Sequence, residues 1–224
     1  MKKIFIVGGM GAGKSTARKA LVDQGLEYID LDSIGHEIHH WQVVKDELVE
    51  AFGDDVLDEN GEVDRPALAR KAFASPAATR MLNKITQPRI EDAFTTRLDE
   101  LEAAGCPAVV VEYSVFRTRQ MSLAYSADVV VAILAPLDVR IERAVSCGFD
   151  EQDVRRRIAS QITDAERIER SDVVFYNDGT KEELYDKVVA WWQSYKSSLS
   201  TGGSDTGPAE RDEGDPVDTN TKSH

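Results

Sequence analysis

The feature that most constrains the fold is the stretch IFIVGGMGAGKSTARKA at residues 4–20. A strand-like apolar run leads into Gly8-x4-Gly13-Lys14-Ser15, and a segment compatible with a helix follows directly. Glycines let backbone N–H groups turn toward a bound anion, and the N-terminus of the next helix adds partial positive charge. In loops of this pattern the lysine reaches the β- and γ-phosphates and the serine hydroxyl ligates Mg²⁺. The residues expected to hold phosphate are Gly8, Gly9, Met10, Gly11, Ala12, Gly13, Lys14, Ser15 and Thr16.

Short β-branched runs alternate with longer amphipathic stretches over residues 1–195, which is typical of βα units on a parallel sheet. We expect strands at KIFIV, EYID, AVVVE, ADVVVAIL and DVVFYN. We expect helices over 14–24, 76–104, 137–146, 150–170 in one or two pieces, and 181–195. The pattern predicts an α/β fold in which helices flank a parallel five-stranded sheet.

The chain divides unevenly. About 75 residues separate the second and third expected strands, far more than one crossover needs, which predicts a helical insertion at about 34–104. The last stretch, 196–224, holds one leucine and one valine among Ser, Thr, Gly, Pro and acidic residues. Such a segment buries too little apolar surface to offset its ordering entropy, so we predict a disordered acidic tail at 196–224.

Composition excludes several classes of protein. With 224 residues and 42% hydrophobic content the chain can form a sizeable core, and its apolar runs are far shorter than the roughly 20 residues of a membrane span. The start lacks a signal-peptide pattern, so we expect a cytoplasmic protein with Cys106 and Cys147 reduced. A net charge of −13 argues against binding nucleic acid or an anionic membrane.

The second expected strand ends in YIDLDS, a stretch that carries two carboxylates. If the extended conformation continues, Asp30 and Asp32 point to the same side and could accept a proton from an attacking hydroxyl or orient Mg²⁺. The alternative is a solvated strand end or a helix cap near Ser33. The histidines His36, His39 and His40 lack partners at metal-ligand spacing and are better explained as helix surface.

Several blocks occur in a distinctive order: GGMGAGKST, YIDLDSIGHEI, FGDDVLDENGEVDRPALARKAF, LNKITQPRI and RRRIASQITDAERIERSDVVFYNDG. In that order and spacing the sequence resembles the dephospho-coenzyme A kinase family over about residues 2–190. The resemblance implies Mg²⁺-dependent transfer of the ATP γ-phosphate to the ribose 3′-hydroxyl of dephospho-CoA, the last step of coenzyme A synthesis. It also implies a phosphate-loop kinase domain at 1–195, in which the helical insertion binds the acceptor and a lid lies at about 138–160.

The resemblance also suggests roles for individual residues. Asp32 matches the presumed base for the 3′-hydroxyl, Lys14 and Ser15 match the phosphate and magnesium positions, and Arg143 matches the first lid arginine. Arg65 and Gln87 fall in the acceptor-binding blocks. Asn177 matches an asparagine near the adenine, and Arg157 and Gln161 match the helix after the lid. Arg155 and Arg156 are better read as solvated helix face.

The sequence departs from the family pattern at three places. Gln87 replaces the usual histidine before proline, Phe116 stands near an expected glutamate, and Cys147 stands where a second lid arginine is usual. Glu112, at the end of the third expected strand, has two equal explanations: it orients Mg²⁺, or it terminates the strand at the edge of the core.

Because of these departures, the sequence leaves two alternatives to a dephospho-CoA kinase. One is a kinase of another small hydroxyl acceptor, and the other is an ATP-binding regulatory protein with weak or no transferase activity. Retention of Asp32 favours a kinase, because a regulatory protein needs no base for a sugar hydroxyl. The sequence leaves the oligomeric state open.

Overall fold

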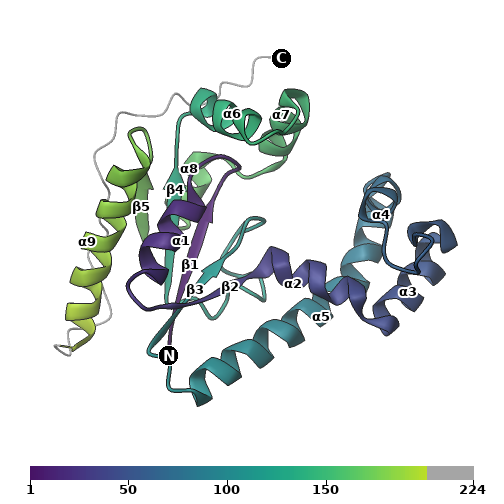
Figure 1. Ribbon diagram of the computed structural model, residues 1–224, viewed down its shortest axis with the longest axis horizontal. Helices are drawn as coiled ribbons and strands as arrows, with labels where there is room; N and C mark the ends of the chain where they lie inside the picture. Colours follow the sequence, from purple (N-terminus) through teal and green to yellow (C-terminus); the bar gives the residue numbers. More distant parts are fainter. Residues whose placement is uncertain (201–224) are drawn as a thin grey trace. The chain divides into compact units, whose positions relative to one another are not determined.

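The computed structural model describes residues 1–200 and contains a parallel five-stranded sheet in the order β2-β3-β1-β4-β5 (Figure 1). The strands are β1 (Lys2–Gly8), β2 (Glu27–Asp30), β3 (Ala108–Glu112), β4 (Val129–Leu134) and β5 (Val173–Tyr176). β1 pairs in parallel with both β3 and β4, and β4 pairs in parallel with β5. The α/β fold with a parallel five-stranded sheet is confirmed.

The helices expected at 14–24, 76–104, 137–146, 150–170 and 181–195 form, and further helices form within 31–72, where only a helical insertion was expected. They are α1 (Lys14–Val22), α2 (Leu31–Glu37), α3 (Gln42–Phe52), α4 (Arg65–Ala72), α5 (Pro76–Ala103), α6 (Leu137–Ser146), α7 (Glu151–Ser160), α8 (Asp164–Glu169) and α9 (Lys181–Ser200), with single turns η1 (Ile38–His40) and η2 (Asp54–Val56). The stretch 150–170 forms two helices because Thr163 starts a new one: its hydroxyl accepts the N–H of Glu166, whose side chain accepts the N–H of Thr163. Within residues 1–200, no helix combines the length and the apolar character that a membrane crossing requires.

The end of α9 corrects one prediction. Composition predicts loss of regular structure from residue 196, whereas the helix continues through Ser200. The hydroxyls of Ser197 and Ser198 donate to the carbonyls of Gln193 and Tyr195, at 2.8 and 2.7 Å, so these serines are satisfied inside the helix. Tyr195 in turn stacks on Trp191, with ring centroids 5.4 Å apart. The remainder of the predicted tail, 201–224, lies outside the described residues.

The chain forms two compact units, which we describe separately. The first unit comprises Met1–Ile29 and the chain from Leu101 onward, and the second comprises Asp30–Glu100. The second unit occupies the same part of the sequence as the helical insertion expected at about 34–104.

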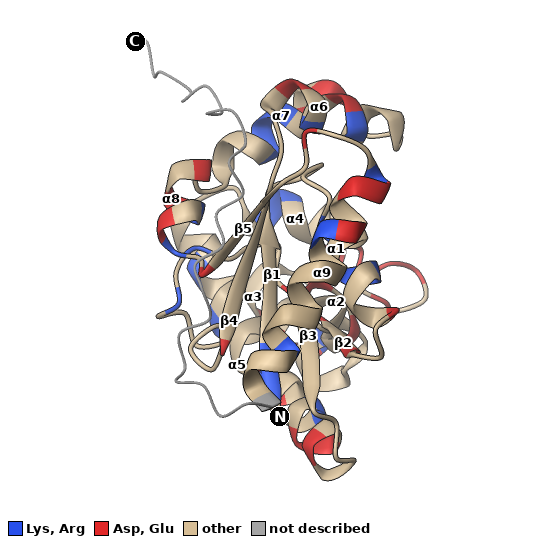
Figure 2. Cartoon of the chain, turned by 90° about the vertical axis from the view of Figure 1, so that its left-hand side faces the viewer, with Lys and Arg blue, Asp and Glu red and all other residues tan. Residues whose placement is uncertain are grey.

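The core of the first unit lies between the sheet and two helices. Ile4, Ile6, Val131 and Ile133 are fully buried on one face of the sheet, which α1 and α9 cover. The charged side chains of the strands lie at their ends, at Lys2 and Lys3 in β1, Glu27 and Asp30 in β2, and Glu112 in β3, whereas β4 and β5 carry none, as Figure 2 shows for β4. Fully burying an aliphatic side chain of this size contributes about 1.5–3 kcal/mol, so this face fixes the positions of the strands and of the loops that follow them.

The second unit is a small helical assembly. Helix α3 packs against η2 and α4, around the fully buried side chains of Val44, Leu48 and Val56. The ammonium of buried Lys45 donates to Glu62 at 2.6 Å, so a close carboxylate offsets the cost of burying this charge. This unit therefore has a core of its own.

Candidate nucleotide-binding site

The register of the sheet brings the loop after β1 close to the residue after β5. Gly8 pairs with Ile133 of β4, and the next residue of β4, Leu134, pairs with Tyr176 of β5. The chain then leaves the sheet at Asn177, whose N–H donates to the carbonyl of Leu134 at 2.7 Å. Ligands of open α/β sheets bind at this carboxyl edge, where neighbouring strands lead away in opposite directions from the centre.

The side chain of Asn177 holds the phosphate loop in place. Its buried side-chain amide donates to the carbonyl of Ala12 at 2.8 Å. Gly13 lies beside it with φ at 108°, and a Cβ on Gly13 would overlap the Nδ2 of Asn177. A glycine is required here for two reasons: the positive φ and the close approach of the amide.

The end of the loop is arranged to receive an anion. α1 begins at Lys14, and Gly13 at its N-cap offers no side-chain hydrogen bond that would compete for the first-turn N–H groups. The Lys14 ammonium lies 3.5 Å from the carbonyl of Gly9, so it reaches back over the loop. Ser15 is exposed at the first turn, where the helix dipole is positive. This combination suits a phosphate group bound at the loop.

Arg143 of α6 lies against the segment after β5. Its guanidinium donates to the carbonyl and the side-chain oxygen of Asn177, at 3.3 and 3.4 Å, and to the carbonyl of Gly179 at 3.4 Å. These distances are long for N–H···O hydrogen bonds. The structure thus places Arg143 beside Asn177, which itself contacts the loop.

A second arginine of α6 touches the loop directly. Arg140 is 5% exposed, and its Nε donates to the carbonyl of Met10 at 3.0 Å. Gln161, the residue after α7, accepts both the N–H of Met10 at 3.2 Å and an N–H of Arg140 at 3.3 Å. The sequence suggests Arg140, beside Arg143, as a cation for the transferred phosphate, but it does not predict the contact of Arg140 with the loop. The available signal was its place four residues before Ala144, on the buried face of α6.

Glu112 at the end of β3 has partners within the first unit. Its carboxylate accepts from the hydroxyl of Tyr28 at 3.5 Å and lies 3.6 Å from the guanidinium of Arg18. Arg18 also donates to the Tyr28 hydroxyl at 2.7 Å. These contacts favour the structural explanation of Glu112, as the anchor of a polar cluster at the strand end. Phe116, which stands near the position of an expected glutamate, is buried edge-on against Tyr113, with ring centroids 6.2 Å apart.

Asp30 and Asp32 do not share one face of a strand, which corrects the prediction. The strand ends at Asp30, and Asp30 caps α2: its carboxylate accepts the N–H of Asp32 and the hydroxyl of Ser33, both at 2.9 Å. This side-chain bond stops the extended conformation at Asp30. Asp32 is exposed in the first turn of α2, so the helix-cap alternative holds for Asp30 alone.

Other predicted acceptor residues also belong to the second unit. Arg65 begins α4 directly after its cap Asp64, and its guanidinium donates to the Nε2 of His36 at 2.5 Å. Gln87 is exposed on α5, immediately before Pro88.

Desolvation and the nearby charge of Arg65 lower the pKa of His39 to about 4. No three metal-ligating side chains come together anywhere in residues 1–200.

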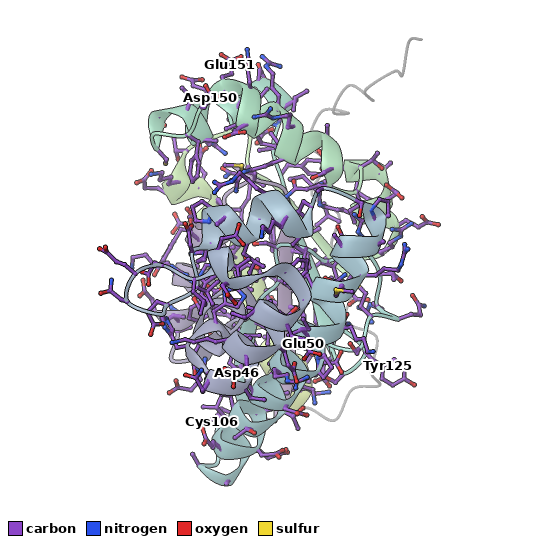
Figure 3. All side chains as sticks on the ribbon, turned by 90° about the vertical axis from the view of Figure 1, so that its right-hand side faces the viewer. Asp46, Glu50, Cys106, Tyr125, Asp150 and Glu151 are labelled. Atoms are coloured by element: carbon purple, nitrogen blue, oxygen red, sulfur yellow. The ribbon has the colours of Figure 1, made fainter. Side chains whose placement is uncertain are left out.

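The region expected as a lid consists of α6 and α7. They pack through Ile141, Ala144 and Val154, and the Met10 side chain packs against this small core. Cys147 caps the C-terminus of α6 and is exposed. Asp150 caps α7, ahead of Glu151 (Figure 3). Arg155 and Arg156 pair with Glu151 and Asp153 on the exposed face of α7, as expected of a solvated surface.

Comparison with known proteins supports the resemblance found in the sequence. The chain matches the dephospho-CoA kinase family over residues 3–183. It is 42% identical over 195 residues to a dephospho-CoA kinase of Corynebacterium efficiens, covering 85% of this chain and 96% of that one. It is 37% identical over 194 residues to that of Streptomyces avermitilis, covering 86% and 93%.

Solved structures agree at the level of the fold. A Thermus thermophilus protein superposes with a TM-score of 0.73 at 25% identity, covering 90% of this chain and 97% of that one. A dephospho-CoA kinase from Campylobacter jejuni superposes with a TM-score of 0.59 at 20% identity, covering 86% and 96%. The family match over residues 3–183 and the sequence relatives show that the chain belongs to the dephospho-CoA kinase family.

Proposed function

We propose that the protein transfers the γ-phosphoryl group of ATP to the ribose 3′-hydroxyl of dephospho-CoA. The observation that carries the proposal is the family match over residues 3–183, which includes the phosphate loop, Asp32, Arg65 and Arg143. The geometry of the first unit supports the ATP half: Lys14, Asn177 and Arg143 all lie at or beside the loop.

In this reaction the 3′-hydroxyl oxygen attacks the γ-phosphorus, the bond from the γ-phosphorus to the bridging oxygen breaks, and ADP leaves. Asp32 accepts the hydroxyl proton; its exposed position at the start of α2 leaves its carboxylate accessible to a substrate. Lys14 offsets negative charge on the β- and γ-phosphates, where fixed cations stabilise the transition state most.

Arg143 supplies a second cation in this proposal. Its bonds of 3.3–3.4 Å to Asn177 and Gly179 are weaker than the charge-assisted bond that a phosphate oxygen offers. We therefore infer that Arg143 exchanges these bonds for the transferring phosphoryl group. Asn177 keeps the loop in place meanwhile through Ala12. On the acceptor side, we propose that Arg65 and Gln87 bind dephospho-CoA.

Mg²⁺ accompanies ATP in this proposal. Mg²⁺ keeps several waters and binds phosphate oxygens with only one or two protein ligands, so the Ser15 hydroxyl fits this requirement without a larger cluster. When bound, the ion neutralises phosphate charge. Glu112 and Asp30 are less suitable ligands, because their carboxylates already pair with Arg18 and cap α2.

A second candidate is a kinase of a different small hydroxyl acceptor. It is favoured by the buried aromatic Phe116 and by Gln87, which both depart from the family pattern outside the phosphate loop. The test is a coupled phosphotransfer assay with ATP and Mg²⁺ against dephospho-CoA and a panel of nucleosides and nucleotides. ADP release that requires dephospho-CoA supports the first candidate. Turnover with a panel member alone supports the second, and ATP binding without any transfer supports a regulatory protein.

A further inference from the structure

Met10, in the phosphate loop, contacts the region after β4 through its carbonyl, its N–H and its side chain. Its carbonyl accepts from Arg140 Nε at 3.0 Å, and its N–H donates to Gln161 Oε1 at 3.2 Å. Its side chain packs against the small core formed by Ile141, Ala144 and Val154. Backbone and side chain of one loop residue are thus fixed by α6, α7 and the residue after α7.

Arg140 closes this arrangement into one polar network. Its Nη2 donates to the same Gln161 oxygen at 3.3 Å, and its guanidinium lies so close to Gly9 that a Cβ there would overlap Nη2. Its Nη1 lies 3.6 Å from Asp164, which also accepts from buried Arg167 at 2.5 Å. Arg140 therefore uses different nitrogens for the loop carbonyl, for Gln161 and for the carboxylate.

The position of the guanidinium decides what Arg140 does. It is 5% exposed and directs its nitrogens at Met10, Gln161 and Asp164. Burial lowers the pKa of Arg140, and Asp164 opposes that effect. A cation that donates to the backbone of the loop fixes the conformation of the loop, whereas one that binds phosphate must present its nitrogens to the ligand.

We propose that Arg140 and Gln161 are positioning residues that clamp Met10 and so preset the phosphate loop for ATP. This inference rests on the proposed binding of ATP at the loop and is independent of the acceptor. The clamp joins the loop to α6 and α7, so the loop and these two helices move together.

The first test needs no nucleotide. Amide hydrogen exchange of Met10, measured by NMR on the full chain, should accelerate about tenfold or more in Gln161→Met, which removes the acceptor, and in Arg140→Met, which frees Gln161. Unchanged exchange at Met10 in both variants would overturn the clamp, whatever the protein phosphorylates.

The second test compares ATP affinity at a temperature where every variant is folded. Arg140→Met and Gln161→Met should each raise the Kd for ATP by about tenfold or more, and the double variant should add little, because both act through Met10. Arg140→Lys should rescue less than half of the loss, since one ammonium cannot reach Met10 and Gln161 together with the geometry of a planar guanidinium.

Arg167→Met is the matched control, because Arg167 is equally buried and shares Asp164 but hydrogen-bonds that carboxylate rather than the loop. It should lower the melting temperature and leave the Kd for ATP within about twofold. Full rescue by Arg140→Lys would show a simple charge effect, and an equal loss in Arg167→Met would show general destabilisation; either result would overturn the proposal. If the wild type bound no ATP, the proposed function would fail, while the exchange measurement would still decide the clamp.

Discussion

The two units present their candidate functional residues in opposite ways. In the first unit the side chains around the loop contact one another: Asn177 binds Ala12, Arg143 binds Asn177, and Arg140 binds Met10. In the second unit Asp32, Arg65 and Gln87 are exposed. A triphosphate is bound largely by backbone N–H groups, which must be fixed in advance, whereas an acceptor is recognised by side chains that can differ between relatives. Of the three departures from the family pattern, Gln87 lies in the second unit, whereas Phe116 and Cys147 lie in the first unit, outside the phosphate loop.

The largest effect should come from the loop. We predict that Lys14→Ala lowers phosphotransfer by about 10³–10⁵-fold, because the β- and γ-phosphates lose a fixed cation. Lys19→Ala is the matched control: it lies on the same helix but is exposed and pairs with Asp23. A coupled assay of ADP release measures both. Turnover of Lys14→Ala near that of Lys19→Ala would remove the loop from the mechanism.

The next largest effect should separate the second unit from the first. We predict that Asp32→Asn lowers kcat by about 10²–10⁴-fold while the Kd for ATP stays nearly unchanged, because an amide keeps the shape but cannot accept the proton. Asp46→Asn on the exposed face of α3 is the control (Figure 3). A loss of ATP affinity with kcat preserved would make Asp32 a ligand-positioning residue instead.

Substitution of Cys147 is expected to raise kcat, whereas the two preceding substitutions lower it. Because it is exposed at the C-terminus of α6, an arginine there meets no packed core and is favourable to the helix dipole. We predict that Cys147→Arg raises kcat by about tenfold, or 1.4 kcal/mol of barrier, with an unchanged melting temperature. Steady-state kinetics and a melting curve test this. Slower turnover together with a lowered melting temperature would show that position 147 takes no part in the lid.

The smallest effect concerns the stability of the second unit. His39 has a pKa of about 4 in the folded chain against its usual 6.5, and its Nδ1 has no hydrogen-bond partner among the described residues. Between these values the unfolded chain binds a proton that the folded chain does not. The stabilisation is therefore complete above pH 6.5 and is lost as the pH falls toward 4.

Chemical denaturation should detect this loss. After allowance for the partly solvated ring, we expect it to be about 1–2 kcal/mol between pH 7 and pH 4.5. His39→Leu should lack this component, because leucine has no proton to bind. Equal pH dependence in wild type and variant would rule out His39 as its source.

The sequence allowed the sheet and the loop to be predicted because both depend on local patterns. Strands covered on both faces read as continuous apolar runs, and the loop is defined by glycine spacing around Lys14. The helical start at Leu31 was missed because one capping contact, from the carboxylate of Asp30, decides it. The contact of Arg140 with the loop could not be predicted, because its partners Met10 and Gln161 are brought to it only by the folded chain.

The position of the transferred phosphate tests the central claim most directly. The full chain is incubated with ATP, Mg²⁺ and dephospho-CoA, and the product is examined by ³¹P NMR, with Lys14→Ala as the blank. The account predicts loss of the γ-phosphate resonance and appearance of one new phosphomonoester on the ribose 3′-oxygen, beside an intact pyrophosphate. Release of inorganic phosphate with dephospho-CoA unchanged, or a phosphomonoester at any other position, would contradict it.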